Sequence, residues 1–214
     1  MEKIMFKNVM PQVFSQQTDL SSDVWSRELV FERGHLYLVE AASGRGKSTF
    51  CSYILGYRHD YSGSIMFDDV DTRSFGVSRW VNVRRQEVRH LFQELRLFPE
   101  LTDMENVKIK NNLTHHKDER QIALWFDAMG IGDKKDTPVC RMSFGQQQRV
   151  AMIRALVQPF SFIMVDEPIS HLDDENSQTM MDIMMQEAKA QGAGVIVTSI
   201  GKHVELDYER RIRL

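Results

Sequence analysis

A glycine-rich segment at residues 41–49, with the sequence A-A-S-G-R-G-K-S-T, constrains this chain more than any other stretch. It follows an apolar run at 36–39 and precedes a segment, 48–55, with the character of a helix. A strand, a glycine-rich turn and a helix in this order are the context that a phosphate-binding loop requires. Gly44 and Gly46 allow the backbone to curl so that successive N–H groups point inward. The first helical turn adds unpaired N–H donors at the positive end of its dipole.

The side chains of this segment suit a nucleotide. Lys47 can reach the outer phosphates, and the hydroxyl of Ser48 can ligate Mg²⁺. The residues expected to hold the nucleotide are Ser43, Gly44, Arg45, Gly46, Lys47, Ser48 and Thr49. The full phosphate-loop pattern, G-x-x-x-x-G-K-[ST], has glycine at the position that Ala41 occupies in this chain. If that position requires a positive φ, alanine costs about 1–2 kcal/mol; otherwise it costs almost nothing, and the sequence leaves both open.

Composition narrows the class of protein. The 214 residues suffice for one large domain or two small ones, and 42% hydrophobic with 27% charged residues is typical of a folded globular chain. The formal net charge of -3 gives no reason to expect nucleic acid as a main partner. Cys51 and Cys140 have no metal-binding spacing and are expected to be free thiols in a reducing compartment. The lack of a signal peptide or long apolar run predicts a cytoplasmic protein, unless a partner holds it at a membrane.

The first part of the chain shows short strand patterns. Strands are expected over 4–9, 25–31, 36–40 and 65–67, with a turn at 62–63 before the last of them. The charged stretch 79–89 is expected to be helical, and a short buried strand at 91–92 should end at Gln93.

The middle of the chain has a different character. Residues 118–129 carry apolar side chains at helical spacing, and Gly130 is a good terminator. We therefore expect a small helical subdomain inserted into an α/β core. Ser143 followed by Gln146 is a capping box, which predicts the start of a helix that Pro159 ends.

The last third returns to the α/β pattern. The apolar run 162–165 is typical of a strand buried on both faces and leads into Asp166 and Glu167. Asp173 can cap a helix that runs to about residue 190, with a methionine stripe that is more often core filler than a binding surface. Another buried strand is expected over 195–198, followed by a polar tail.

Alternating strands and helices predict an open, mostly parallel sheet, in which ligands bind outside the carboxyl ends of the strands. Lys47, Gln93, Asp166 and Ser199 each follow a predicted strand, so one sheet edge should gather them. Asp166 then suits Mg²⁺, and Glu167 could act as general base on an attacking water. Gln93 could touch both the metal and the water. The competing interpretation of Asp166 and Glu167 is that they are polar residues at a solvated strand end. For Ser143, the competing interpretation is that the capping box only initiates a helix.

The ordered set of motifs resembles an ATP-binding-cassette (ABC) ATPase, the nucleotide-binding subunit of ABC transporters. The phosphate loop resembles the Walker A motif, L-F-Q-E-L-R-L-F-P-E-L-T around Gln93 a Q-loop, M-S-F-G-Q-Q-Q-R the family signature, F-I-M-V-D-E-P a Walker B motif, and S-H-L-D at 170–173 a D-loop. The segment around Gln93 is also similar to the lipoprotein-release and macrolide-export type of ATPase. The resemblance implies an α/β P-loop NTPase fold with an N-terminal antiparallel part. One domain, 1–214, would contain the core at 1–93 and 147–214 and the helical subdomain at 94–146.

The resemblance also implies a head-to-tail dimer, formed by two identical chains or by a paired cassette. The Walker loop of one chain would meet the signature of the other, so Ser143, Gly145 and Gln146 would contact the γ-phosphate in trans. Glu167 would be the catalytic base and Asp173 would communicate across the interface. The aromatic residue that stacks on adenine would be Phe14, with Trp25 as the second candidate.

Three positions depart from the family pattern. Ala41 replaces the first Walker glycine, Phe144 replaces the first glycine of L-S-G-G-Q, and Ser199 stands where a histidine usually contacts the γ-phosphate. Serine can form hydrogen bonds but cannot carry charge. The sequence therefore supports ATP binding more strongly than fast ATP hydrolysis.

Two functions remain open from the sequence. The first is an ATP-hydrolysing transporter subunit that binds ATP and Mg²⁺ and docks on a separate membrane permease, peripheral at the cytoplasmic face. In the family that contact lies near the Q-loop, here roughly 95–107, where Leu97, Phe98 and Leu101 could serve it or be buried in the subdomain. The second is an ATP-gated regulatory module with little turnover.

Overall fold

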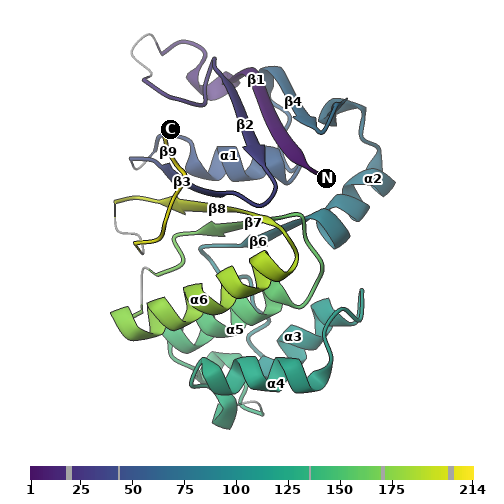
Figure 1. The fold of residues 1–214 in the computed structure, drawn as a ribbon, viewed down its shortest axis with the longest axis vertical. Coiled ribbons are helices and arrows are strands. Elements are labelled where there is room, and N and C mark those ends of the chain that lie inside the picture. Colours follow the sequence, from purple (N-terminus) through teal and green to yellow (C-terminus); the bar gives the residue numbers. More distant parts are fainter. Residues whose placement is uncertain (18–20, 43, 135, 170–171, 202–204) are drawn as a thin grey trace.

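The computed structural model describes residues 1–17, 21–42, 44–134, 136–169, 172–201 and 205–214. It contains two sheets, one antiparallel and one parallel, with helices on both sides of the parallel sheet (Figure 1). This arrangement confirms the expected α/β class with an N-terminal antiparallel part.

The antiparallel sheet comes from the first third of the chain. Its strand order is β2-β1-β4-β5. The strands are β1 (Lys3–Pro11), β2 (Glu28–Glu32), β4 (Tyr61–Phe67) and β5 (Val70–Asp71). Ile4, Phe6 and Phe31 of this sheet are fully buried and share one core with the first long helix, α1 (Lys47–Ile54).

The second sheet has five strands. Its order is β6-β7-β8-β3-β9, and every neighbouring pair is parallel. The strands are β3 (Leu36–Glu40), β6 (Val88–Leu91), β7 (Phe162–Asp166), β8 (Gly194–Ser199) and β9 (Arg210–Arg213). Strand β7 is buried along its whole length: Met164 faces the core that contains α1, whereas Ile163 and Val165 face the opposite core. Burial on both faces explains the unbroken apolar run.

The remaining long helices pack on the face of the parallel sheet away from α1 (Figure 1). They are α3 (Asp103–Asn111), α4 (Glu119–Ala128), α5 (Phe144–Leu156) and α6 (Asp174–Ala190). The predicted caps are confirmed, since Ser143 and Gln146 form the capping box of α5 and Asp173 caps α6. The methionine stripe of α6 fills the core, as expected: its members Met180, Met181 and Met184 are fully buried.

Short elements complete the chain. Helix α2 (Val77–Asn82) continues into a π-helical turn, η3 (Val83–Glu87). The short 3₁₀ turns are η1 (Gln12–Phe14), η2 (Thr72–Ser74), η4 (Gly132–Lys134) and η5 (Val139–Arg141).

Four local expectations are wrong. The second strand begins at Glu28, because Trp25 turns inward to pack 6.4 Å from Phe14, measured between ring centroids. The helix expected over 79–89 ends at Glu87, and Arg89 belongs to β6, where its guanidinium is bonded to backbone carbonyls. The polar tail forms a further strand, β9, which the sequence did not reveal because Ile212 is its one fully buried residue.

The turn expected at 62–63 is also wrong, since both residues lie inside β4. Gly63 has φ +78°, and a Cβ there would come within 2.2 Å of the carbonyl oxygen of Asn8. The register between β1 and β4 shifts between Lys7 and Met10. The glycine therefore serves a bulge rather than a hairpin turn.

The helices α3 and α4 fall inside 94–146, the stretch expected to form the inserted subdomain. Their buried residues Val107, Ile122 and Phe126 belong to the same hydrophobic core as α5 and one face of the parallel sheet. The boundaries at 93/94 and 146/147 therefore stay a prediction. Among the described residues, no helix is both long and apolar enough to cross a membrane.

Candidate nucleotide-binding site

The glycine-rich loop adopts the curled backbone that its sequence predicts. Gly44 has φ +78° and Gly46 has φ +100°, and Gly46 caps the N-terminus of α1. The amide of Phe50 donates to the carbonyl of Gly46 at 2.8 Å, which closes the first helical turn. A Cβ at Gly46 would lie 2.7 Å from the ring of Phe14. Both the positive φ and this close approach require glycine here.

Ala41 fits its position without strain. It is not among the residues with a positive φ, and its amide donates to the carbonyl of Ser199 at 3.0 Å. Its side chain is buried, with 5% exposed, in the core beside α1. Of the two alternatives that the sequence left open, the structure supports the one in which alanine costs almost nothing.

We therefore expect Ala41→Gly to leave the affinity for ATP within about twofold, because alanine already adopts the required backbone. The free energy of unfolding should fall by about 0.5–1 kcal/mol, since glycine has more conformational freedom to lose. Isothermal titration with ATP and urea unfolding measure the two effects. A gain in affinity of tenfold or more would mean that Ala41 does hinder the loop.

The ammonium of Lys47 lies at the centre of a buried ion cluster. Its Nζ is 2.7 Å from Oδ1 of Asp166 and 2.5 Å from Oε1 of Glu167. Burial tends to lower the pKa of Lys47, but hydrogen bonds and the charges of the two carboxylates outweigh it, so the pKa is raised. Lys47 is therefore a full positive charge at neutral pH, held where β7 ends.

Two further side chains position this cluster. Thr198, on β8, donates its hydroxyl to Oδ1 of Asp166 at 2.5 Å. Gln93, just beyond β6, accepts from Nζ of Lys47 at 3.5 Å and donates to Oε2 of Glu167 at 3.4 Å. The structure thus brings Lys47, Gln93 and Asp166 to one sheet edge, as the strand ends predicted, with Glu167 beside them.

The backbone of Glu167 contributes to this geometry. Glu167 has φ +49°, and its amide donates to the carbonyl of Thr198 at 3.0 Å. A positive φ is uncommon for a residue other than glycine and clusters at functional sites. Here it turns the carboxylate toward Lys47 directly after the strand.

A cavity of about 480 Å³ opens over the loop. Lys47, Ser48, Thr49 and Gln93 line it together with residues that sequence reasoning did not single out: Val13, Ala42, Arg58 and Ile200. Arg58 donates to the hydroxyl of Thr49 at 3.1 Å and pairs with Asp60, so it adds a second cation beside the loop. Arg58 lies in an irregular segment after α1, where the sequence has no motif that would indicate its role.

Phe14 also lines this cavity, whereas Trp25 does not. The exposed fraction of Phe14 is 6%, against 61% for its neighbour Val13. Trp25 is 3% exposed and packs behind Phe14. Of the two aromatic candidates, Phe14 is the one that lines the cavity, and its contact with adenine stays a prediction.

Ser199 lies at the end of β8 but is 1% exposed. Its carbonyl binds the amide of Ala41, and the residue that reaches the cavity is the next one, Ile200, with 45% exposed. The sequence prediction that Ser199 contacts the γ-phosphate remains untested by this geometry.

The signature residues lie apart from the loop within one chain. Helix α5, which Ser143, Gly145 and Gln146 begin, packs on the opposite face of the parallel sheet from α1 (Figure 1). Ser143 and Gln146 satisfy each other's backbone amides, at 3.3 and 2.9 Å. Phe144, at the first position of the helix, is 41% exposed.

Asp173 stays exposed beyond β7, and its carboxylate accepts from the amide of Asn176 at 2.8 Å. This backbone hydrogen bond lowers the pKa of Asp173. Ser43 of the loop and residues 170–171 of the D-loop segment lie outside the described residues.

Comparison with known proteins agrees with this geometry. The family model described as "ABC transporter" matches residues 26–170. The lipoprotein-releasing system ATP-binding protein LolD of Syntrophus aciditrophicus is 29% identical over 176 residues, which cover 80% of this chain and 78% of LolD. The macrolide export ATP-binding/permease protein MacB of Shewanella sp. ANA-3 is 30% identical and matches 95% of this chain, which spans only 31% of MacB.

Solved structures show the same likeness. The dimeric bacterial ABC transporter cassette MJ0796 has a TM-score of 0.77 at 25% identity, covering 92% of this chain and 87% of that one. The chain therefore belongs to the ABC transporter family, as an ATPase cassette homologous to the ATP-binding subunits of transporters.

Proposed function

We propose that this cassette hydrolyses Mg²⁺-ATP at the cavity over the glycine-rich loop. The observation that carries the proposal is the buried cluster in which Lys47 pairs with Asp166 and Glu167. A triphosphate in the cavity would give the ammonium a more highly charged partner, so Lys47 would turn to the phosphates and release both carboxylates. The curled loop amides and the N-terminus of α1 add donors for the same phosphates.

The released groups have the chemistry that hydrolysis needs. Ser48, Gln93 and Asp166 offer hard oxygen ligands, the set that Mg²⁺ prefers. When bound there, Mg²⁺ would neutralise charge on the β- and γ-phosphates. Glu167 would accept a proton from the attacking water, and Gln93, whose amide already reaches Glu167, would orient that water. Phe14 is the proposed contact of the adenine.

We propose further that the complete site forms between two cassettes. Ser143, Gly145 and Gln146 begin a helix whose N-terminus suits an anion, yet within one chain α5 and α1 lie on opposite faces of the sheet. In a head-to-tail pair of chains, the N-terminus of α5 of one chain would lie opposite the glycine-rich loop of the other. Ser143 of the partner subunit would then face the γ-phosphate bound by Lys47. Asp173, exposed at the cap of α6, would lie at the same junction.

Release of phosphate from ATP by the purified chain, with and without Mg²⁺, tests the hydrolysis directly. Magnesium-dependent turnover supports it. ATP binding without turnover would favour the alternative, a gated regulatory module, for which the one supporting observation is the buried serine at position 199. Family membership and the dimeric cassette that the chain resembles favour hydrolysis.

A separate permease is the proposed partner, which would hold the cassette at the cytoplasmic face of a membrane. Phe98 is 52% exposed beyond the Q-loop, so it remains available to such a partner. Nearby lies a cavity of about 100 Å³ lined by four cationic side chains: Arg84, Arg89, Lys110 and Arg154. Burial lowers the pKa of Arg89 and of Arg154 to about 10 each. Among the described residues, none of the four has an ion-pair partner.

An acidic side chain from the permease would complement this basic cavity, the one lined by the four cations above. Lys110→Glu reverses one of its charges at an exposed position, so the fold should be unaffected. We expect the share of the chain that sediments with membranes of its own cells to fall about tenfold, because a buried charge contact is worth about 1.5–3 kcal/mol. The turnover of the isolated chain should not change.

Lys189→Glu, which makes the same charge change at the exposed end of α6, is the matched control and should sediment as the wild type does. Equal loss in both variants would show that net charge, not the basic cavity, governs the association.

A further inference from the structure

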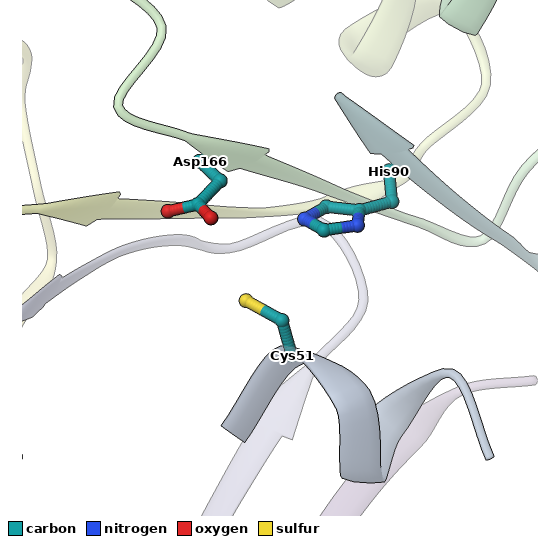
Figure 2. Close-up of side chains that lie close together, drawn as sticks. All are labelled: Cys51, His90 and Asp166. Atoms are coloured by element: carbon teal, nitrogen blue, oxygen red, sulfur yellow. The ribbon is translucent and has the colours of Figure 1, made fainter. Parts of the chain in front are cut away.

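Three potential metal ligands meet beneath the glycine-rich loop. Cys51 comes from α1, His90 from β6 and Asp166 from the end of β7. One ligand atom of each lies within 4.8 Å of the others. Figure 2 shows the thiol, the imidazole and the carboxylate pointing into the space between them. Tetrahedral zinc sites use these three ligand types.

The ring of His90 packs against that of Phe92, with 4.2 Å between centroids, but within the part of the chain that the structure describes its polar atoms are unpaired. Both of its ring nitrogens are buried, and among the described residues neither has a hydrogen-bond partner. An unpaired buried polar group of this kind is costly, and each one in a native structure needs an explanation. Burial lowers the pKa of His90 to about 4, so the ring is neutral at pH 7 and has a lone pair for a metal.

Asp166 can join such a site without losing its present contacts. Lys47 and Thr198 both bind its Oδ1, so Oδ2 can turn to a metal. Cys51 is 2% exposed, and burial raises the pKa of its thiol, so it is protonated when no metal is present. Metal binding would form the sulfur–metal bond and release the thiol proton to solvent.

The charge balance favours a divalent cation. Asp166 and Glu167 carry two negative charges around the single positive charge of Lys47, so the buried cluster has one uncompensated negative charge. A divalent ion with the Cys51 thiolate would add a net positive charge and make the whole cluster neutral. Thiolate and imidazole select zinc-like ions over Mg²⁺.

We propose that Cys51, His90 and Asp166 form an inhibitory site for a zinc-class divalent ion. The ion occupies Asp166, so the carboxylate is no longer available to Mg²⁺-ATP. The inhibitory part rests on the proposed hydrolysis, whereas metal binding does not. The site is separate from the proposed magnesium ligands except at Asp166.

The test is titration of the full chain, reduced and freed of metal, with Co²⁺ in excess Mg²⁺. We expect one Co²⁺ per chain and a thiolate-to-cobalt charge-transfer band. Cys51→Ala and His90→Phe should weaken binding about 100-fold or more, because each removes a ligand. Cys140→Ser, which alters the exposed cysteine, is the matched control and should bind as the wild type does.

Competition with Zn²⁺ should remove the cobalt band, and Zn²⁺ should inhibit ATP turnover of the wild type but not of Cys51→Ala. A missing thiolate band, or equal Co²⁺ affinity in Cys51→Ala and wild type, would overturn the site. Normal binding without inhibition would overturn only its inhibitory role. A chain that hydrolyses no ATP yet binds Co²⁺ through Cys51 would contradict the proposed function and leave the metal site standing.

Discussion

Glu167→Gln should lower ATP turnover by about 100-fold or more, because loss of a positioned general base costs 10²–10⁴ in rate. The amide has the shape of the carboxylate but cannot accept the proton of the attacking water. The affinity for ATP should change little, since the proposed phosphate contacts come from Lys47 and the loop amides. Phosphate release and isothermal titration with ATP measure the two quantities.

Glu175→Gln is the control, an identical change at an exposed position in the first turn of α6. It should leave turnover unchanged. Turnover of Glu167→Gln within about tenfold of the wild type would mean that another group takes the proton, against the assignment of Glu167 as base.

Lys47→Met should weaken ATP binding about 100-fold or more, because charge-assisted contacts to phosphate are the strongest that the loop can make. The same change leaves Asp166 and Glu167 facing each other without their cation. Breaking a buried pair costs about 3–5 kcal/mol, so Tm should fall by about 6 °C or more. Isothermal titration with ATP and calorimetry measure the two effects.

The double variant Lys47→Met with Asp166→Asn separates the two roles of the lysine. Neutralising one carboxylate should restore much of the lost stability, whereas ATP binding should stay weak. If the single variant were as stable as the wild type, the cluster would not be a charge pair that folding depends on. If it still bound ATP normally, Lys47 would not be the phosphate contact.

Much of this site could be predicted because its residues follow elements that the sequence marks strongly. Residues 162–165 of β7 and the apolar run before the loop are buried on both faces, so their apolar patterns are unbroken. Asp166 is the last residue of β7, and Lys47 begins the helix after the loop that follows β3; parallel strands bring such ends to one edge of the sheet. The capping box at Ser143 is equally local, since its two hydrogen bonds join residues three apart.

The parts that escaped prediction depend on contacts distant in sequence. Strand β9 has a single fully buried residue and forms only by pairing with β3. Arg58 reaches the loop through Thr49, and Gly63 is required by the approach of Asn8 in another strand. The strain at Glu167 has no local signature either. His90 gave no signal in the sequence, because its relation to Cys51 and Asp166 exists only in the folded sheet.

In the proposed dimer, ATP joins two of these cassettes through the loop of one and the signature helix of the other. Light scattering of the Glu167→Gln variant with Mg²⁺-ATP tests it most directly, because the slow variant would retain the nucleotide. We predict that the mass rises from the 24.9 kDa of one chain to that of two only when ATP is present, and that Gly145→Asp in the same background prevents the rise. A variant that binds ATP fully yet keeps the mass of one chain would contradict the account.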